Sequence, residues 1–146
     1  MSTYFQSAED AQASAKWLLV DVADKPVGRV ASQIAAMLRG KNSPKFTKHV
    51  NGGDFVVVVN ASKIKFTGNK RQQKMYYNYS GYIGGLREQN ADEVLNTNPE
   101  RVIISAVKGM LPRGALGHNI IKKLKVYPGL EHPHASQKPE VVEVSL

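Results

Sequence analysis

The sequence predicts an α/β domain, and three observations carry that prediction. The continuous β-branched run from Phe55 to Val59 is typical of a strand covered on both faces, and therefore of a sheet lying between other layers. An apolar run at 17–22 precedes a stretch, 27–38, in which apolar residues recur at helical spacing. Helix starts follow at Asn90 and Asn98. The order strand, helix, strand, helices is an α/β pattern with a right-handed crossover.

The residues around the first strand and helix set their bounds. The run Trp17–Val22 ends in an Asp-Val-Ala-Asp sequence, which predicts a buried strand that reaches a turn. Pro26 suits the first turn of the following helix, and Gly40 is typical of its C-terminal cap. The apolar face of this helix is expected to comprise Val27, Val30, Ala31, Ile34, Ala35 and Leu38.

Two later helices have recognisable starts. Asn90, with Glu93 three residues on, predicts a capping box. Asn98 followed by Pro99 predicts a second and longer helix. Its apolar face is expected to comprise Val102, Ile103, Ala106, Val107 and Met110.

The segment 106–125 sets glycines and cations around a few apolar anchors. Gly109 and Pro112 are expected to end the longer helix, and a four-residue apolar spacing predicts a shorter helix carrying Leu116, Ile120 and Leu124. Val107, Met110 and Leu124 are expected to anchor the segment. The cations, with no acid among them, are Lys108, Arg113, Lys122, Lys123 and Lys125. The segment is therefore predicted to lie on phosphate, and the chain from Tyr127 onward to be loop.

The segment Lys70–Tyr82 combines four tyrosines with three cations. Its aromatic rings can stack on unpaired bases while its cations hold phosphates. Alternating tyrosines in a strand also commonly pack half-buried against neighbouring strands. The sequence leaves both interpretations open.

The composition indicates one soluble domain. The chain has 146 residues, no cysteine and no apolar run near the ~20 residues of a membrane helix. Residues 1–15 lack Lys and Arg and carry no signal-peptide pattern, so we expect a cytoplasmic protein. We predict an N-terminal extension at 1–15, either disordered or held by a partner, and a single domain at 16–146 that includes the C-terminal loop tail.

The positive charge falls in blocks. Residues 16–50 hold seven Lys or Arg against two acids, whereas 61–87 and 101–125 each hold six against none. The formal net charge is +8. Such segregation favours a polyanion partner, bound largely through release of counterions, although charge alone does not distinguish DNA, RNA and membrane.

Enzymatic motifs are weak. Gly40-Lys41 resembles the end of a phosphate loop, yet the first glycine of that motif is replaced by Ala35 and its final hydroxyl by Asn42. The glycine-rich segment 81–85 lacks a full dinucleotide fingerprint. His132 and His134 have no cysteine or third ligand nearby, so we predict no metal site and no cofactor. A nucleotide-dependent enzyme and a free DNA-binding or regulatory RNA-binding module remain as alternative functions.

A family resemblance adds to these observations. The segments that carry it occur in order from about Trp17 to Pro139 and read VGRVA, LRGK, GDFVVVVNA, TGNK, SGYIGGL, AVKGMLP and LKVYPGLEHPH. So many motifs in register resemble the universal large-subunit ribosomal protein thirteen family, of bacterial type. Tyr79, Ile83 and His118 depart from the commonest pattern of that family.

The resemblance implies a three-layer α/β/α fold with a mostly parallel, about four-stranded sheet. It also implies a structural constituent of the large ribosomal subunit without catalytic activity, which binds large-subunit ribosomal RNA, supports early assembly and neighbours other ribosomal proteins. Carried over from the family, the resemblance implies RNA-proximal motif positions at Arg29, Arg39, Lys41, Lys70, Lys108, Arg113, His132 and His134. The charge blocks and the tyrosine-rich segment extend the predicted RNA-binding set to Lys45, Lys48, Arg71, Lys74, Tyr76, Tyr77, Arg87, Lys122, Lys123 and Lys125. His118, which stands where the family usually has Arg, completes the predicted set.

Overall fold

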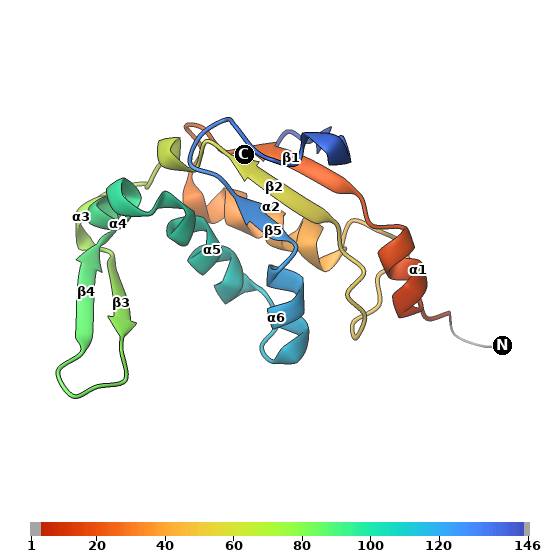
Figure 1. Ribbon diagram of the computed structural model, residues 1–146, viewed down its shortest axis with the longest axis horizontal. Coiled ribbons are helices and arrows are strands. Elements are labelled where there is room, and N and C mark those ends of the chain that lie inside the picture. Colours follow the sequence, from red (N-terminus) through yellow and green to blue (C-terminus); the bar gives the residue numbers. More distant parts are fainter. Residues whose placement is uncertain (1–3, 145–146) are drawn as a thin grey trace.

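A parallel four-stranded sheet forms the centre of the fold (Figure 1). The structure is a computed structural model that describes residues 4–144. The strands lie in the order β5-β2-β1-β6. Their bounds are β1 (Trp17–Asp21), β2 (Phe55–Val59), β5 (Leu124–Val126) and β6 (Glu140–Val141). The predicted α/β class and parallel sheet are confirmed.

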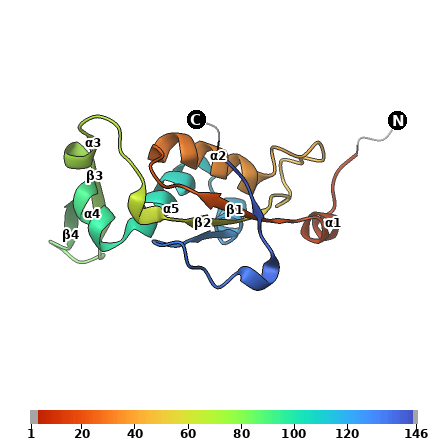
Figure 2. The same cartoon turned by 90° about the horizontal axis from the view of Figure 1, so that it is seen from above.

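The main helices pack beside this sheet, and α2 lies over one of its faces (Figure 2). The helices are α1 (Ala8–Ala13), α2 (Val27–Arg39), α3 (Lys70–Gln73), α4 (Ala91–Thr97), α5 (Pro99–Met110) and α6 (Ala115–Ile121). Short 3₁₀ turns occur at η1 (Ala61–Lys63) and η2 (Ala135–Gln137). The segment that joins β5 to β6 passes across the other face of the sheet (Figure 2).

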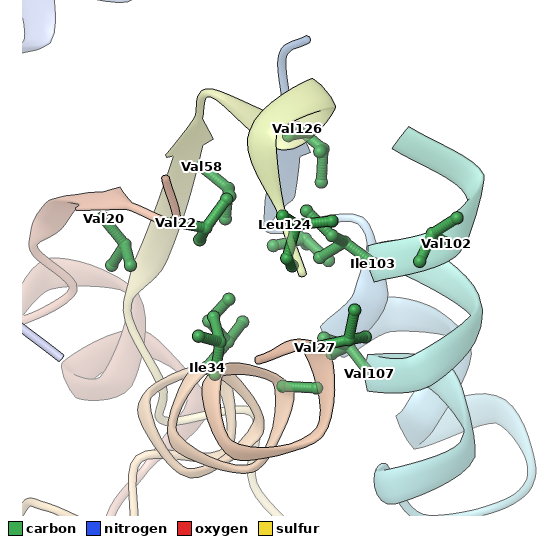
Figure 3. Packing of buried hydrophobic residues seen from close by; sticks show 14 of the residues in the cluster. Val20, Val22, Val27, Ile34, Val58, Val102, Ile103, Val107, Leu124 and Val126 are labelled. Atoms are coloured by element: carbon green, nitrogen blue, oxygen red, sulfur yellow. The ribbon is translucent and has the colours of Figure 1, made fainter. Parts of the chain in front are cut away.

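The core lies between the sheet, α2 and α5 (Figure 3). Val20 and Val58 from the strands meet Ile34 of α2 and Ile103 of α5, and all four side chains are buried. Val57 of β2 is buried as well, on the opposite side of the pleat from Val58. The prediction of a strand covered on both faces is therefore confirmed.

Three predicted helix caps are confirmed, whereas Gly109, which was expected to end the longer helix, lies inside α5, whose C-cap is Leu111. Gly40 ends α2 in the left-handed conformation, with φ of 78°. Asn90 and Glu93 form a capping box at α4. The Asn98 side chain accepts the backbone N–H of Arg101 at the start of α5.

A two-stranded antiparallel hairpin projects from this body (Figure 1). Its strands are β3 (Met75–Tyr79) and β4 (Leu86–Asn90). The tyrosine-rich segment is therefore half of a hairpin. The sequence does not predict β4, because the polar residues of Leu86–Asn90 show no strand periodicity.

Some element predictions are wrong. The tail beyond Tyr127 is not all loop, because β6 pairs in parallel with β1 at the edge of the sheet. Leu124 does not continue α6 but begins β5, where pairing with β2 outweighs the helical spacing. Met110 is half exposed and therefore a poor anchor. Residues 1–3 of the predicted extension and 145–146 of the tail lie outside the described residues.

Candidate RNA-binding surface

The turn between α5 and α6 brings cations and close backbone together. Gly117 packs directly on the carbonyl of Pro112, and a Cβ at this position would lie 1.8 Å from that oxygen. This contact folds the start of α6 back against the end of α5. A hollow of about 150 Å³ results, lined by Lys108, Leu111, Pro112, Arg113, Gly114, Gly117, His118 and Ile121. Lys108 and Arg113 are exposed at this hollow.

The C-terminal end of α2 extends the same surface. A second hollow, of about 300 Å³, shares Leu111 and Pro112 with the first and is also lined by Arg39 and Lys41. Cations that are far apart in the sequence therefore meet around one turn. The negative end of the α2 dipole favours cations here, which helps to concentrate them. We call these two adjoining hollows the turn surface.

Arg39 holds the loop that follows α2 in place. Its Nη2 donates to the carbonyl of Lys48 at 2.7 Å, and its guanidinium lies 5.5 Å from the centre of the Phe46 ring. Its Nη1 is buried and has no hydrogen-bond partner among the described residues. Lys41, Lys45 and Lys48 are exposed along this loop. We call residues 41–51 the basic loop.

Lys123 holds the other end of the basic loop from inside the protein. The residue is buried, at 8% exposure, and its Nζ donates to the carbonyls of Gly53 at 2.7 Å and Asn51 at 3.3 Å. The ammonium also lies 5.2 Å from the centre of the Phe55 ring. Burial lowers the pKa of Lys123, and the nearby Asp54 carboxylate acts in the opposite direction.

Close glycine packing fixes the same end of the loop. A Cβ on Gly53 would lie 1.8 Å from the carbonyl oxygen of Leu38, so that only glycine fits against the end of α2. Gly40 packs against Gly52 in the same way. The loop is therefore held at its base by the backbone of α2 as well as by Lys123.

The N-terminal segment packs on the basic loop. Gln6 is buried, and its backbone N–H donates to Thr47 Oγ1 at 3.3 Å. The Phe5 ring lies 5.8 Å from the His49 ring. Residues 4–15 therefore contact the domain itself, an arrangement that differs from the predicted alternatives of disorder or an external partner.

The family model described as Ribosomal protein L13 matches residues 15–133. A large ribosomal subunit protein uL13 from Chromobacterium violaceum is 55% identical over 94% of this chain and 97% of its own length. The uL13 of Oleidesulfovibrio alaskensis is 59% identical over 88% and 89%, and that of Syntrophomonas wolfei is 51% identical over 99% of both chains.

The chain belongs to the ribosomal protein L13 family. The family match includes the turn surface, the basic loop and Lys123, and it begins at residue 15, the last residue of the N-terminal segment. The cations that the structure brings together at the turn surface and the basic loop therefore all lie within the part of the chain that matches the family.

A second basic group of this L13-family chain lies at the base of the hairpin. Lys70 and Lys74 line a hollow of about 300 Å³ together with Phe66 and Tyr76. The Lys74 Nζ lies 5.4 Å from the centre of the Tyr76 ring. Burial raises the pKa of Tyr76, and its ring is not free to stack on a base. Arg71 forms an ion pair with Asp92, which partly neutralises it.

The remaining predicted cations are dispersed. Lys125 is half-buried in β5, whereas the exposed side chains outside the turn surface and the loop are Arg29, Arg87 and Lys122. Among the described residues, the ion pairs within 4.0 Å are Lys16 with Glu140, Lys65 with Asp24, and Arg71 with Asp92. Most predicted contact cations therefore have no acidic neighbour at ion-pair distance in the described part of the chain.

The predicted histidines serve different local roles. His134 Nε2 is 2.9 Å from the Tyr127 hydroxyl, and its ring lies 5.1 Å from that of Trp17. His132 Nδ1 accepts the His134 backbone N–H at 3.3 Å. These contacts hold the tail on the sheet. His118 is exposed at the turn surface, where its Nδ1 lies 2.7 Å from the Gly114 carbonyl oxygen.

The phosphate-loop alternative does not fit the backbone. Gly40 and Lys41 follow a helix, with their N–H groups donating to the Met37 and Ala36 carbonyls at 3.0 Å each. A phosphate loop instead precedes a helix and directs free N–H groups at the anion. The described residues contain no group of three His, Cys, Asp or Glu placed to hold a metal ion. In the same part of the chain, we find no helix of the length and apolarity that crossing a membrane requires.

Proposed function

We propose that this protein is a structural constituent of the large ribosomal subunit that binds large-subunit ribosomal RNA and supports subunit assembly. It is not an enzyme. The observation that carries the proposal is the turn surface, where α2, α5 and α6 gather cations that form no ion pair with the described residues, in a chain of the L13 family. Its place is accordingly the ribosome, and we expect that ribosome to be cytoplasmic. Its neighbours there are RNA and other subunit proteins.

RNA binding here proceeds through phosphates and shape. Exposed Lys and Arg side chains neutralise phosphates and release counterions, while the rigid turn sets their spacing. We include in the RNA-binding surface Arg29, Lys41, Lys45, Lys48, Lys70, Lys74, Arg87, Lys108, Arg113, His118, Lys122 and Lys125. Arg39 and Lys123 support this surface by positioning the basic loop.

Other predicted residues receive different roles in the proposal. Tyr76 is buried and Arg71 is already paired with Asp92, so we leave both out of the RNA-binding surface. His134 contacts Tyr127 and Trp17, and we assign it, with His132, to holding the tail.

Gradient sedimentation tests the proposed function. The tagged protein should sediment with large subunits and remain with them through washing at moderate salt. Recovery only in the soluble top fractions would refute the proposal.

Binding to a large-subunit RNA fragment tests the surface itself. Each phosphate contact releases bound counterions and makes the plot of log affinity against log salt steeper. Loss of one contact in Arg113→Gln should therefore reduce the magnitude of that slope by about 0.7 to 0.9. Lys16→Gln is the matched control, because Lys16 already pairs with Glu140. Equal slopes for Arg113→Gln and the parent would remove Arg113 from the surface.

A further inference from the structure

The outer face of the β3–β4 hairpin exposes aromatic and aliphatic side chains that lie outside the RNA-binding surface proposed above. Tyr77 pairs across the hairpin with Glu88, and Tyr79 pairs with Leu86. Because directly paired residues of antiparallel strands lie on the same face, these four side chains share one face. Tyr79 is 62% exposed, and all four lie open to solvent.

The tip of the hairpin extends this apolar surface. Ile83 is fully exposed and Tyr82 is 79% exposed. Contact between water and a fully exposed isoleucine is unfavourable in free energy. Contiguous exposed apolar surface of this kind marks interaction sites. Figure 1 shows the hairpin projecting away from the four-stranded sheet, so the rest of the domain does not cover its tip.

The charges on the two faces differ. Lys74 and Arg87 lie on the inner face of the hairpin, the face that carries the buried Tyr76. Lys74 is two residues before Tyr76, and Arg87 pairs with Asn78, two residues after it. The outer face carries no Lys or Arg and one carboxylate, that of Glu88, which forms no ion pair among the described residues. A phosphate backbone on this face would meet a negative charge and no cation. A basic protein segment would meet a complementary charge and an apolar surface.

We propose that the outer face of the hairpin, formed by Tyr77, Tyr79, Leu86 and Glu88 with Tyr82 and Ile83 at its tip, docks a basic, apolar-bearing segment of a neighbouring large-subunit protein. This inference rests on the proposed function, because it places the chain in the subunit. The tyrosines supply rigid amphipathic contact area, and Glu88 pairs with a Lys or Arg of the partner.

Site-specific photo-crosslinking within purified large subunits tests the docking. A benzoylphenylalanine in place of Tyr79 should crosslink to a subunit protein at a Lys- or Arg-containing peptide, identified by mass spectrometry. The same probe in place of Lys122 should crosslink to RNA. A position-79 crosslink to RNA, to a second copy of this chain, or to no protein would overturn the docking proposal. Failure of the position-122 probe to reach RNA would instead count against the proposed function.

Charge reversal at Glu88 distinguishes a basic protein partner from RNA without the photo-crosslinking residue. Against a basic protein, Glu88→Lys should lower incorporation into large subunits about tenfold in competition with the parent, while affinity for the isolated RNA fragment stays within twofold. A steeper salt slope and tighter RNA binding for Glu88→Lys would show that this face contacts RNA and would overturn the proposal.

A matched pair at Tyr79 tests the aromatic contact. Tyr79→Ser should lower incorporation about tenfold, as truncation of an aromatic anchor does at interfaces, whereas Tyr79→Phe keeps the ring and should compete equally. Equal incorporation of Tyr79→Ser and Tyr79→Phe would overturn the role of this ring.

Discussion

Replacing Lys123 with methionine tests whether this lysine supports the basic loop or contacts RNA. Lys123 and Lys122 are adjacent in the sequence, yet Lys122 is exposed and Lys123 is buried with its ammonium on the Gly53 and Asn51 carbonyls. Methionine keeps most of the volume of the buried stem and removes the ammonium. The substitution therefore isolates the two hydrogen bonds.

The expected magnitude follows from the groups left behind. Hydrogen bonds made by a charged donor each contribute about 1.5–3 kcal/mol, and a buried acceptor without a partner costs about 1–3 kcal/mol. The variant also removes the desolvation penalty that lowers the pKa of Lys123, which offsets part of that loss. We expect the free energy of unfolding to fall by about 1–3 kcal/mol.

Urea denaturation and salt-dependent RNA binding measure the two effects. Lys123→Met should be less stable, with faster amide exchange in residues 41–53. Its affinity for RNA should fall because the loop is less ordered, while the salt slope stays unchanged. Lys122→Met, the matched control, should keep parental stability and lose about 0.7 to 0.9 of the slope. A parental stability with a reduced slope in Lys123→Met would refute the positioning role.

Three further predictions concern the scaffold. Gly117→Ala should lower the free energy of unfolding in urea titrations by about 1–3 kcal/mol, because its Cβ would collide with the Pro112 carbonyl. Gly109→Ala, which has open space around it, should raise that free energy by up to about 1 kcal/mol. Asn98→Ala should cost about 1 kcal/mol in thermal unfolding, since the side chain caps α5, and an unchanged melting temperature would contradict this role. A hydrogen bond from the Asn60 amide lowers the pKa of Asp21 in the folded protein. The stability that ionised Asp21 contributes is therefore present above the pKa of the unfolded state and is lost as the pH falls through the pKa of the folded state. Asp21→Asn should therefore lose less stability than the parent between about pH 5 and pH 3 in urea titrations, and equal losses would argue against this coupling.

Local sequence signals predicted the elements whose cause is local. The apolar spacing of α2, the left-handed cap at Gly40 and the cap at Asn98 each depend on neighbours within a few residues. The β-branched run of β2 also predicted its strand, because a strand that is buried on both faces is apolar throughout and does not alternate with polar residues. Motif order sufficed to suggest the family to which the chain belongs.

The sequence does not predict the elements that are defined by pairing with distant strands. Glu140 and Val141 form a strand only because β1 presents an open edge, and Leu124 begins a strand because β2 lies beside it. Nothing within the polar β4 segment predicts its pairing with β3. Hydrogen bonds between strands far apart in the chain leave no mark on local periodicity.

The sequence by itself determined the fold class, the C-terminal cap of α2, the N-terminal caps of α4 and α5, the charge blocks and the family. The tertiary structure alone decided which cations face outward. Lys122 and Lys123 are the same residue type in the same block, yet one side chain is in solvent and the other is inside the base of the basic loop. The physical reason is that burial of a charge depends on which carbonyls the fold brings within hydrogen-bonding distance, and Gly53 is 70 residues away along the chain.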